Sequence, residues 1–213
     1  MKMKKLSVLL SAFVGASLVS VEASAWILHR VPLASDYVSR GGIGSWFDHN
    51  PTTGVFLRYD NTTLGGRDKH SGVDFPVLGG IWASANGKVV YTKNDCRDYP
   101  NPEGLPPDRA CGGRLGNHVR ILHANWMVSV YGHMKKGSVA VSDQLQVLCG
   151  RLLGNTGNSG ESDGIHLHFV LWSDQNGTQL IDPFGGPASN QGFSHWVNQN
   201  AFGVGKPGTT CQA

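Results

Sequence analysis

Two pairs of side chains, far apart in the chain, have the types and spacing of metal ligands. His166 and His168 are separated by one residue, and His70 and Asp74 by three. Because side chains alternate between faces along an extended strand, residues two or four apart point to the same side. Zn²⁺ takes imidazole nitrogen and carboxylate oxygen, and a catalytic zinc keeps three protein ligands and one open position. The first hypothesis is therefore a zinc site made of His70, Asp74 and either His166 or His168.

The histidine of the later pair that does not bind the metal would lie beside it. An imidazole in that place can hydrogen-bond the reacting water or stabilise a developing oxyanion, since its charge can change near neutral pH. His133, which ends an expected strand, is a second residue of this kind. For His123, an edge-of-core position and a supporting position near the site both fit. The other histidines are interpreted as surface or core residues: His29, His49, His118 and His195.

Short strands are expected to position these residues. Glycine is frequent, 29 of 213 residues, and short apolar runs alternate with turn sequences. The expected strands are Gly54–Tyr59, Val73–Phe75, Ile81–Ala83, Gly87–Tyr91, His118–His123, Trp126–His133, two within Val139–Leu153, and His166–Trp172. Strands at short intervals predict a mainly all-β, antiparallel domain.

Composition and charge exclude some classes of protein. Hydrophobic residues make up 40% of the chain and charged residues 15%, which is not the composition of a disordered protein. Without residues 1–25, 15 basic residues (18 minus three lysines) face 14 acidic ones (15 minus Glu22). A net charge of about +1 gives no electrostatic basis for binding nucleic acid or an anionic membrane.

Residues 1–25 have the pattern of a secretory signal peptide. Three lysines among the first five residues precede an apolar stretch, and Ala23-Ser24-Ala25 is a typical cleavage sequence. A membrane anchor is the alternative, but serines and a glycine interrupt the stretch, which is shorter than the about 20 apolar residues of a span. We expect an exported protein, periplasmic or secreted, without a membrane span in the mature chain.

The four cysteines all lie beyond the signal peptide, and an even number in an exported protein suggests two disulfides. Three pairings are open. We favour Cys96–Cys111, because these residues bracket one compact insertion, which leaves Cys149–Cys211 to tie the C-terminal tail to the core. A cysteine metal site is the alternative, but no close Cys-x-x-Cys spacing occurs.

Four short motifs then occur in an order that is typical of a known family. They are His70-Ser71-Gly72-Val73-Asp74, Tyr131-Gly132-His133-Met134, the glycine-rich segment 154–160, and His166-Leu167-His168-Phe169. Together they resemble the lysostaphin-like zinc metallopeptidases of family M23, and Ile181-Asp182-Pro183 resembles the segment that closes the family domain.

The resemblance implies a role for each residue. His70, Asp74 and His168 match the ligands of one Zn²⁺ per chain, whereas His133 and His166 match the histidines that position or activate water. The implied fold is an antiparallel β-sheet groove whose cleft is walled by long loops. The implied reaction is hydrolysis of peptide bonds in peptidoglycan stem or cross-bridge peptides, or of other glycine-containing peptides.

The resemblance also implies a division of the chain. Residues 26–66 would be an N-terminal extension, 67–186 the peptidase domain with an insertion at 94–115, and 187–213 a tail packed on the domain. We expect a monomer. The alternative function is a catalytically silent module of the same family that binds peptidoglycan or activates another cell-wall hydrolase. A third interpretation is an exported metal-binding or disulfide-stabilised structural protein.

Overall fold

The computed structural model describes residues 27–50, 52–63, 66–189, 192–199 and 207–212, so the expected signal peptide lies outside the described residues. Within these ranges no helix is long and apolar enough to cross a membrane. The elements are β1 (Val73–Phe75), β2 (Gly80–Trp82), β3 (Gly87–Lys93), the 3₁₀-helix η1 (Cys111–Arg114), β4 (Asn117–Leu122), β5 (Val128–Met134), β6 (Gln146–Val147), β7 (Leu152–Asn155), β8 (Leu167–Trp172) and β9 (Leu180–Ile181).

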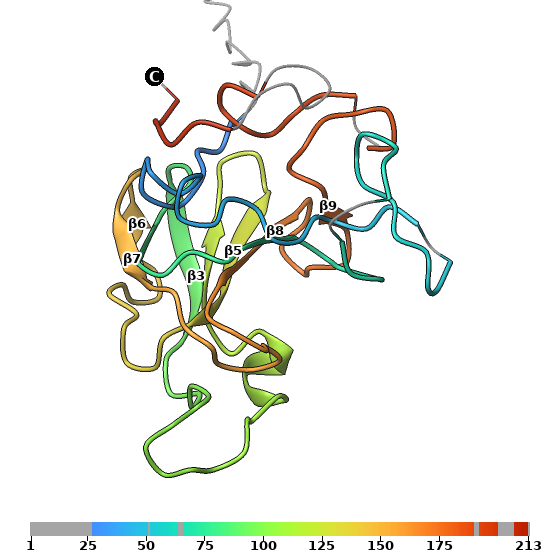
Figure 1. The fold of residues 1–213 in the computed structure, drawn as a ribbon. Coiled ribbons are helices and arrows are strands. Elements are labelled where there is room, and N and C mark those ends of the chain that lie inside the picture. The colour runs from blue at the N-terminus through green and yellow to red at the C-terminus, as the bar shows by residue number, and fades with distance from the viewer. Residues whose placement is uncertain (1–26, 51, 64–65, 190–191, 200–206, 213) are drawn as a thin grey trace, which may run out of the picture.

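One antiparallel sheet dominates the molecule (Figure 1). Its strands run in the order β1-β8-β5-β4-β3-β6, with β9 paired to β8, and β2 and β7 form a second, two-stranded sheet. The expected all-β, antiparallel fold is confirmed, and each of the expected strands from residue 73 onward has a counterpart. β5 and β8, which lie side by side in the middle, are buried along their whole lengths.

The expected hairpin forms between β4 and β5. The N–H of His123 donates to the carbonyl of Met127 (2.9 Å), and the side-chain oxygen of Asn125 accepts from the N–H of Met127 (3.3 Å). Trp126 takes the left-handed conformation at the tip, with φ 67°. The turn thereby sets the pairing that carries His133 to the far end of β5.

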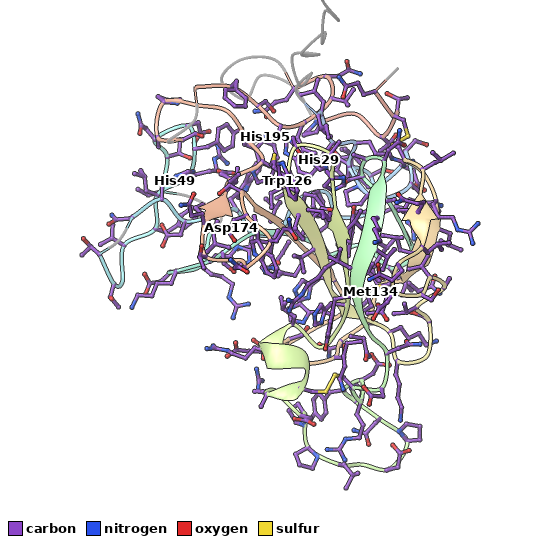
Figure 2. The ribbon with its side chains drawn as sticks, turned by 180° about the vertical axis from the view of Figure 1, so that it is seen from behind. His29, His49, Trp126, Met134, Asp174 and His195 are labelled. Carbon is purple, nitrogen blue, oxygen red and sulfur yellow. A yellow bond between two sulfur atoms is a disulfide. The ribbon has the colours of Figure 1, made fainter. Side chains whose placement is uncertain are left out.

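The flanking segments complete the same hydrophobic core. Val31, Leu33 and Tyr37 from the N-terminal segment are buried together with Trp196 from the C-terminal segment. His29 pairs with Trp196, and its N–H donates to the carbonyl of His195 (2.6 Å). Figure 2 shows His29 and His195 at the opposite end of the sheet from Met134. The two segments therefore cover one end of the sheet and leave the Met134 end to other loops.

Both favoured disulfides are present. Cys149 is bonded to Cys211, 62 residues away, which ties the C-terminal segment to the loop before β7. Cys96 is bonded to Cys111, 15 residues away. We call residues 94–115, which link β3 to β4, the stapled arm; it projects from the Met134 end of the sheet (Figure 1).

One expected strand is absent. Gly54–Tyr59 has no strand pairing and runs as an irregular segment. The reason is local: the N–H of Leu57 donates to the carboxylate of Asp48 (3.0 Å), and the N–H of Arg58 donates to the carbonyl of Thr62 (2.9 Å). Backbone donors that a strand would use in a ladder are engaged in a turn instead.

Candidate metal centre and cleft

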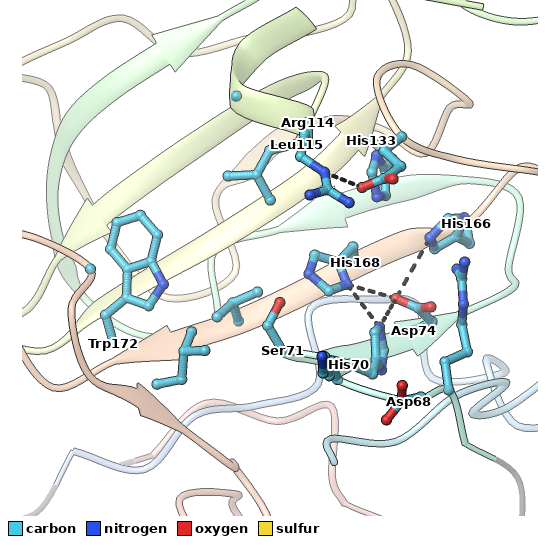
Figure 3. A pocket seen from close by; sticks show the side chains of 17 residues that line it. Asp68, His70, Ser71, Asp74, Arg114, Leu115, His133, His166, His168 and Trp172 are labelled. Carbon is cyan, nitrogen blue, oxygen red and sulfur yellow. Dashed lines mark hydrogen bonds and ion pairs between the residues drawn. The ribbon is translucent and has the colours of Figure 1, made fainter. Parts of the chain in front are cut away.

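The pairing register of three strands brings the predicted site residues together. β8 lies between β1 and β5, so that His168 is directly opposite Asp74 on one side and Gly132 on the other. His133 follows Gly132, and His70 lies in the turn that leads into β1. The expectation that residues two or four apart share one face agrees with the structure, since His70, His166 and His168 all approach the carboxylate of Asp74 (Figure 3).

The glycine between the two early residues is required for this approach. A Cβ atom at Gly72 would lie 2.5 Å from the carbonyl oxygen of Phe169 and 2.9 Å from the ring of His168. Real Cβ atoms do not come so close to a backbone oxygen. Glycine at this position therefore allows β1 to lie close enough to β8 for ligands from both strands to meet.

Three of these side chains converge on one point. Nδ1 of His168 lies 2.7 Å from Oδ1 of Asp74, and Nε2 of His70 lies 3.1 Å from the same oxygen. The two nitrogens are 3.3 Å apart. His70, Asp74 and His168 are thus grouped as residues that could hold a metal ion.

The donor set fits Zn²⁺ in chemistry and spacing. Ligand atoms about 2.0–2.1 Å from a tetrahedral zinc lie about 3.3 Å from one another. The N–H at Nδ1 of His70 donates to the carbonyl of Trp46 (2.8 Å), which leaves a lone pair on Nε2, the atom that faces Asp74. Atoms with lone pairs come this close when a proton or a cation lies among them.

The N-terminal segment holds this side of the site. Residues 44–49 run beside β1, where Ser45 and Asp74 exchange backbone hydrogen bonds. We call residues 44–49 the buttress. Besides the carbonyl of Trp46, it contributes the N–H of Asp48, which donates to the carbonyl of His70 (2.9 Å). Sequence reasoning missed this contribution, because backbone carbonyls and amides leave no residue-type signal.

Asp48 also fixes the turn before His70. Its Oδ2 accepts from the N–H of Lys69 (2.8 Å), and its Oδ1 accepts from the N–H groups of Asn50 (2.9 Å) and Leu57 (3.0 Å). Lys69 has a left-handed backbone, with φ 57°, which a non-glycine residue adopts only when its surroundings hold it. The hydrogen bond from the N–H of Lys69 to the carboxylate of Asp48 stabilises this conformation.

His133 and His166 lie side by side at the edge of the group of three, with ring centres 4.7 Å apart. The Nδ1–H of His133 donates to the carbonyl of Ser159 (2.8 Å), and that of His166 donates to the carbonyl of Gly164 (2.8 Å). Each ring therefore presents Nε2 with a free lone pair, and Nε2 of His166 is 3.6 Å from Oδ1 of Asp74.

The backbone around His133 is constrained. His133 itself has a left-handed backbone, with φ 56°, and its N–H donates to the carbonyl of Leu115 at the base of the stapled arm (2.8 Å). A Cβ atom at Gly160, where φ is 74°, would lie 2.3 Å from the backbone nitrogen of Gly116. The arm, the end of β5 and the 155–164 loop are thus locked together, and this accounts for the glycine after Ser159.

Burial and neighbours set the protonation states of the site. Burial acts to raise the pKa of Asp74, but the close contacts with the rings of His168 and His70 outweigh it and hold that pKa well below its usual range. Burial lowers the pKa of His168, against the opposing effect of Asp74. Burial also lowers the pKa of His133 to about 3, reinforced by His168 and His166. An ionised carboxylate and neutral imidazoles are the states in which these groups bind a metal or accept a proton.

A cleft of about 640 Å³ opens over these residues (Figure 3). Apolar side chains form part of its lining, and they extend from the base of the arm along β8 to β9: Leu115, Val170, Trp172 and Leu180. Arg67 and Arg114 also line it, and Arg114 forms an ion pair with Glu161.

The remaining histidines do not line the cleft. His29, His118, His123 and His195 are buried, and burial is the main cause that lowers the pKa of each. His123 bonds the hydroxyl of Ser129 (2.8 Å) and the carbonyl of Asn86 (2.7 Å), so the edge-of-core interpretation holds. His49 pairs with the buried carboxylate of Asp182 (2.8 Å).

Comparison of the sequence with models of protein families identifies a family for this chain. The sequence model for peptidase family M23 matches residues 68–183, which is more than half of the chain. This range contains all five residues that the structure gathers around the cleft.

Two curated relatives carry different names. The chain is 32% identical over 104 residues to the peptidoglycan DD-endopeptidase ShyA of Vibrio cholerae, covering 48% of this chain and 20% of that protein. It is 28% identical over 142 residues to the murein hydrolase activator NlpD of Salmonella typhimurium, covering 66% of this chain and 31% of that protein. In both cases the chain corresponds to less than a third of the relative's length.

A solved structure supports the fold. The structure of the SpoIIQ–SpoIIIAH pore forming complex matches with a TM-score of 0.51 and 19% sequence identity, covering 75% of this chain and 90% of that one. At this identity the likeness concerns the arrangement of strands and not the chemistry of the site.

Proposed function

The chain belongs to peptidase family M23, and from that premise we propose that it is an exported zinc metalloendopeptidase that cleaves peptide bonds in peptidoglycan stem or cross-bridge peptides. The observation that carries the proposal is the complete site. Three ligand atoms lie within 3.3 Å of one another, and two further imidazoles beside them present free Nε2 atoms.

In this proposal His70, Asp74 and His168 hold the metal. When bound there, Zn²⁺ lowers the pKa of a water to about 7 and polarises the scissile carbonyl. The carbonyl of Trp46 keeps His70 in the tautomer that offers Nε2, and the pairing of β1 with β8 keeps Asp74 against His168. These contacts prepare the ligand atoms before the metal arrives.

His133 and His166 move protons. Burial keeps the imidazole of His133 neutral, and the carbonyl of Ser159 holds its N–H at Nδ1, so Nε2 is the atom that accepts a proton from the attacking water. His166 is oriented in the same way by the carbonyl of Gly164. An imidazole that has taken up a proton can donate a hydrogen bond to the developing oxyanion and return the proton to the leaving amine.

The experiment is hydrolysis of purified peptidoglycan by the zinc-loaded full chain. We expect new amino groups to appear, to stop appearing when a chelator removes the metal, and to reappear when Zn²⁺ is restored. Mass spectrometry of the products identifies the bond and shows whether it contains glycine. Zinc-loaded protein that releases no new amines would contradict the proposal.

A second candidate function is a silent module that activates another cell-wall hydrolase. The relative named murein hydrolase activator NlpD favours it. Against it stands the presence of all five site residues in one cleft. The two functions differ in one result, because a silent module would stimulate a partner hydrolase while releasing no amines by itself.

A further inference from the structure

Two further hollows lie in succession beside the cleft, and each shares lining residues with the one before it. A hollow of about 290 Å³ shares Arg67, Asp74 and His166 with the cleft. The same hollow is also lined by the turn Asp163-Gly164-Ile165. The same turn also lines a third pocket, of about 800 Å³, so each of the three spaces shares lining residues with the next.

The stapled arm forms one wall of this third pocket, which we call the arm pocket. The arm contributes residues 97–103, and the other walls come from Leu78, from Lys135 and Lys136, and from the 156–158 segment. The arm is the insertion that the sequence analysis singled out, and the proposed reaction makes no use of this part of it.

The arm is held in place against the site loop, so that the pocket has a defined shape. The N–H of Tyr99 donates to the carbonyl of Asn158 (3.0 Å), and the side chain of Asn158 donates back to the carbonyl of Tyr99. Asp98 accepts from the N–H groups of Lys136 (2.9 Å) and Asn158 (3.3 Å). The Cys96–Cys111 disulfide closes the arm at its base.

The lining combines exposed apolar groups with charged side chains of both signs. Leu78, Tyr99 and Ile165 are 63%, 44% and 50% exposed, a large exposure for apolar side chains that share one pocket. Three acidic residues line the pocket: Asp98 accepts from backbone N–H groups, Asp163 pairs with Arg109, and Glu103 lies on the arm. The basic side chains in the lining are Arg97, Lys135 and Lys136.

We propose that the arm pocket is a distal subsite of the same cleft, which binds a second peptide segment of the substrate through an apolar side chain and a carboxylate. The lining residues that neighbouring spaces share point to the substrate as the occupant, and Lys135 and Lys136 on one wall offer ammonium groups to a carboxylate of that substrate. This proposal rests on the proposed function for the identity of the substrate. It implies that the enzyme prefers long or cross-linked substrates to short peptides.

Two variants remove apolar groups of the arm pocket from different segments: Tyr99→Ala and Leu78→Ser. Both side chains are exposed, so neither change opens the core. Leu105→Ala is the matched control, because Leu105 lies in the same arm, is 41% exposed and does not line the pocket. Replacing Lys135 and Lys136 together by glutamine tests the charge, with Lys88→Gln on β3 as its control.

The first readout is kcat/KM on two probes. The long probe is intact cross-linked peptidoglycan, and the short probe is its scissile peptide trimmed to two residues on each side of the bond. We expect the pocket variants to lose about tenfold on the long probe, as for removal of one well-packed side chain from an interface, and nothing on the short one. Equal kcat/KM values for pocket and control variants on the long probe would overturn the distal subsite and leave the proposed function intact.

The second readout does not need hydrolysis. On a His166→Ala background, which prevents digestion, the same variants are sedimented with peptidoglycan. If the wild-type chain cleaves neither probe, the proposed function fails, and sedimentation then decides the distal subsite. Weaker binding by the pocket variants than by Leu105→Ala supports it, and equal binding overturns it.

Discussion

Two segments beside the site, the buttress and the stapled arm, are built in different ways. The buttress, residues 44–49, is an extended segment whose backbone bonds directly to His70 and Asp74. The stapled arm reaches the site through its base, where the carbonyl of Leu115 accepts from His133, and its outer part projects away from the sheet (Figure 1). The buttress therefore sets the geometry of the ligands, whereas the stapled arm shapes the space that a substrate can fill.

The largest effects are expected from the imidazoles themselves. Replacing His166 or His133 by alanine should lower kcat by about 10²–10⁴-fold, because a positioned proton carrier is lost. Zinc content should stay at the wild-type level, since neither residue belongs to the group of three. The measurement is kcat together with metal analysis of the same preparation. A variant with normal zinc and normal kcat would remove that histidine from the mechanism.

The next effect concerns the close approach of β1 and β8. Gly72→Ala places a methyl group 2.5 Å from the carbonyl of Phe169, so we expect a loss of about 1–3 kcal/mol in unfolding free energy and a marked loss of zinc affinity. Gly104→Ala in the arm is the control. Gly104 also has a positive φ, 65°, but nothing lies within 4 Å of its added Cβ. It should lose about 1 kcal/mol and bind zinc normally. Equal zinc affinities in the two variants would show that the close approach of β1 and β8 does not set the geometry of the ligands.

A smaller effect is expected from the buttress. Asp48→Asn replaces one carboxylate oxygen by an amide nitrogen, so at least one of its three bonds from N–H groups, which include that of Lys69 in the turn before His70, is lost. We expect a zinc affinity about 10–100-fold weaker, as for other groups that support a ligand. Asp60→Asn is the matched control, because Asp60 lies in the same extension and, within the described part of the chain, its carboxylate bonds Arg58 and Thr62 and not the turn before His70. Competition with a zinc chelator measures both; equal affinities would show that the buttress does not act through Asp48.

The smallest effect at the metal is expected from opening the arm. Replacing Cys96 and Cys111 by alanine removes a link between residues 15 apart, which costs about 3 kcal/mol of stability by chain entropy. Zinc affinity and kcat on the short probe should stay within about twofold of wild type, a shift of under 0.5 kcal/mol. Thermal unfolding and the two assays test this. A collapse of zinc binding would show that the arm, too, sets ligand geometry.

The sequence predicted the parts of the site that depend on residue type and spacing. Two histidines at i and i+2, and a histidine and an aspartate at i and i+4, fall on or directly before facing strands whose apolar runs were visible. The buttress was not predictable in this way, because it acts through the carbonyl of Trp46 and the amide of Asp48. Gly54–Tyr59 failed as a strand for a related reason: side-chain and turn bonds that engage its N–H groups depend on the tertiary structure.

The arm shows the same division. Its cysteines and prolines indicated a stapled insertion, and the disulfide is present. The pocket that it forms depends on Leu78, Ile165 and Lys136, which come from three other segments. No spacing in the sequence relates these residues, so only the fold reveals that they share a space.

The central claim is that three residues hold the metal and two do not. Zinc stoichiometry by native mass spectrometry, on alanine variants of all five, tests it most directly. We expect zinc to be lost from the variants of His70, Asp74 and His168 and retained at one per chain in those of His133 and His166. Retention of zinc in any of the first three, or its loss from either of the last two, would contradict the account.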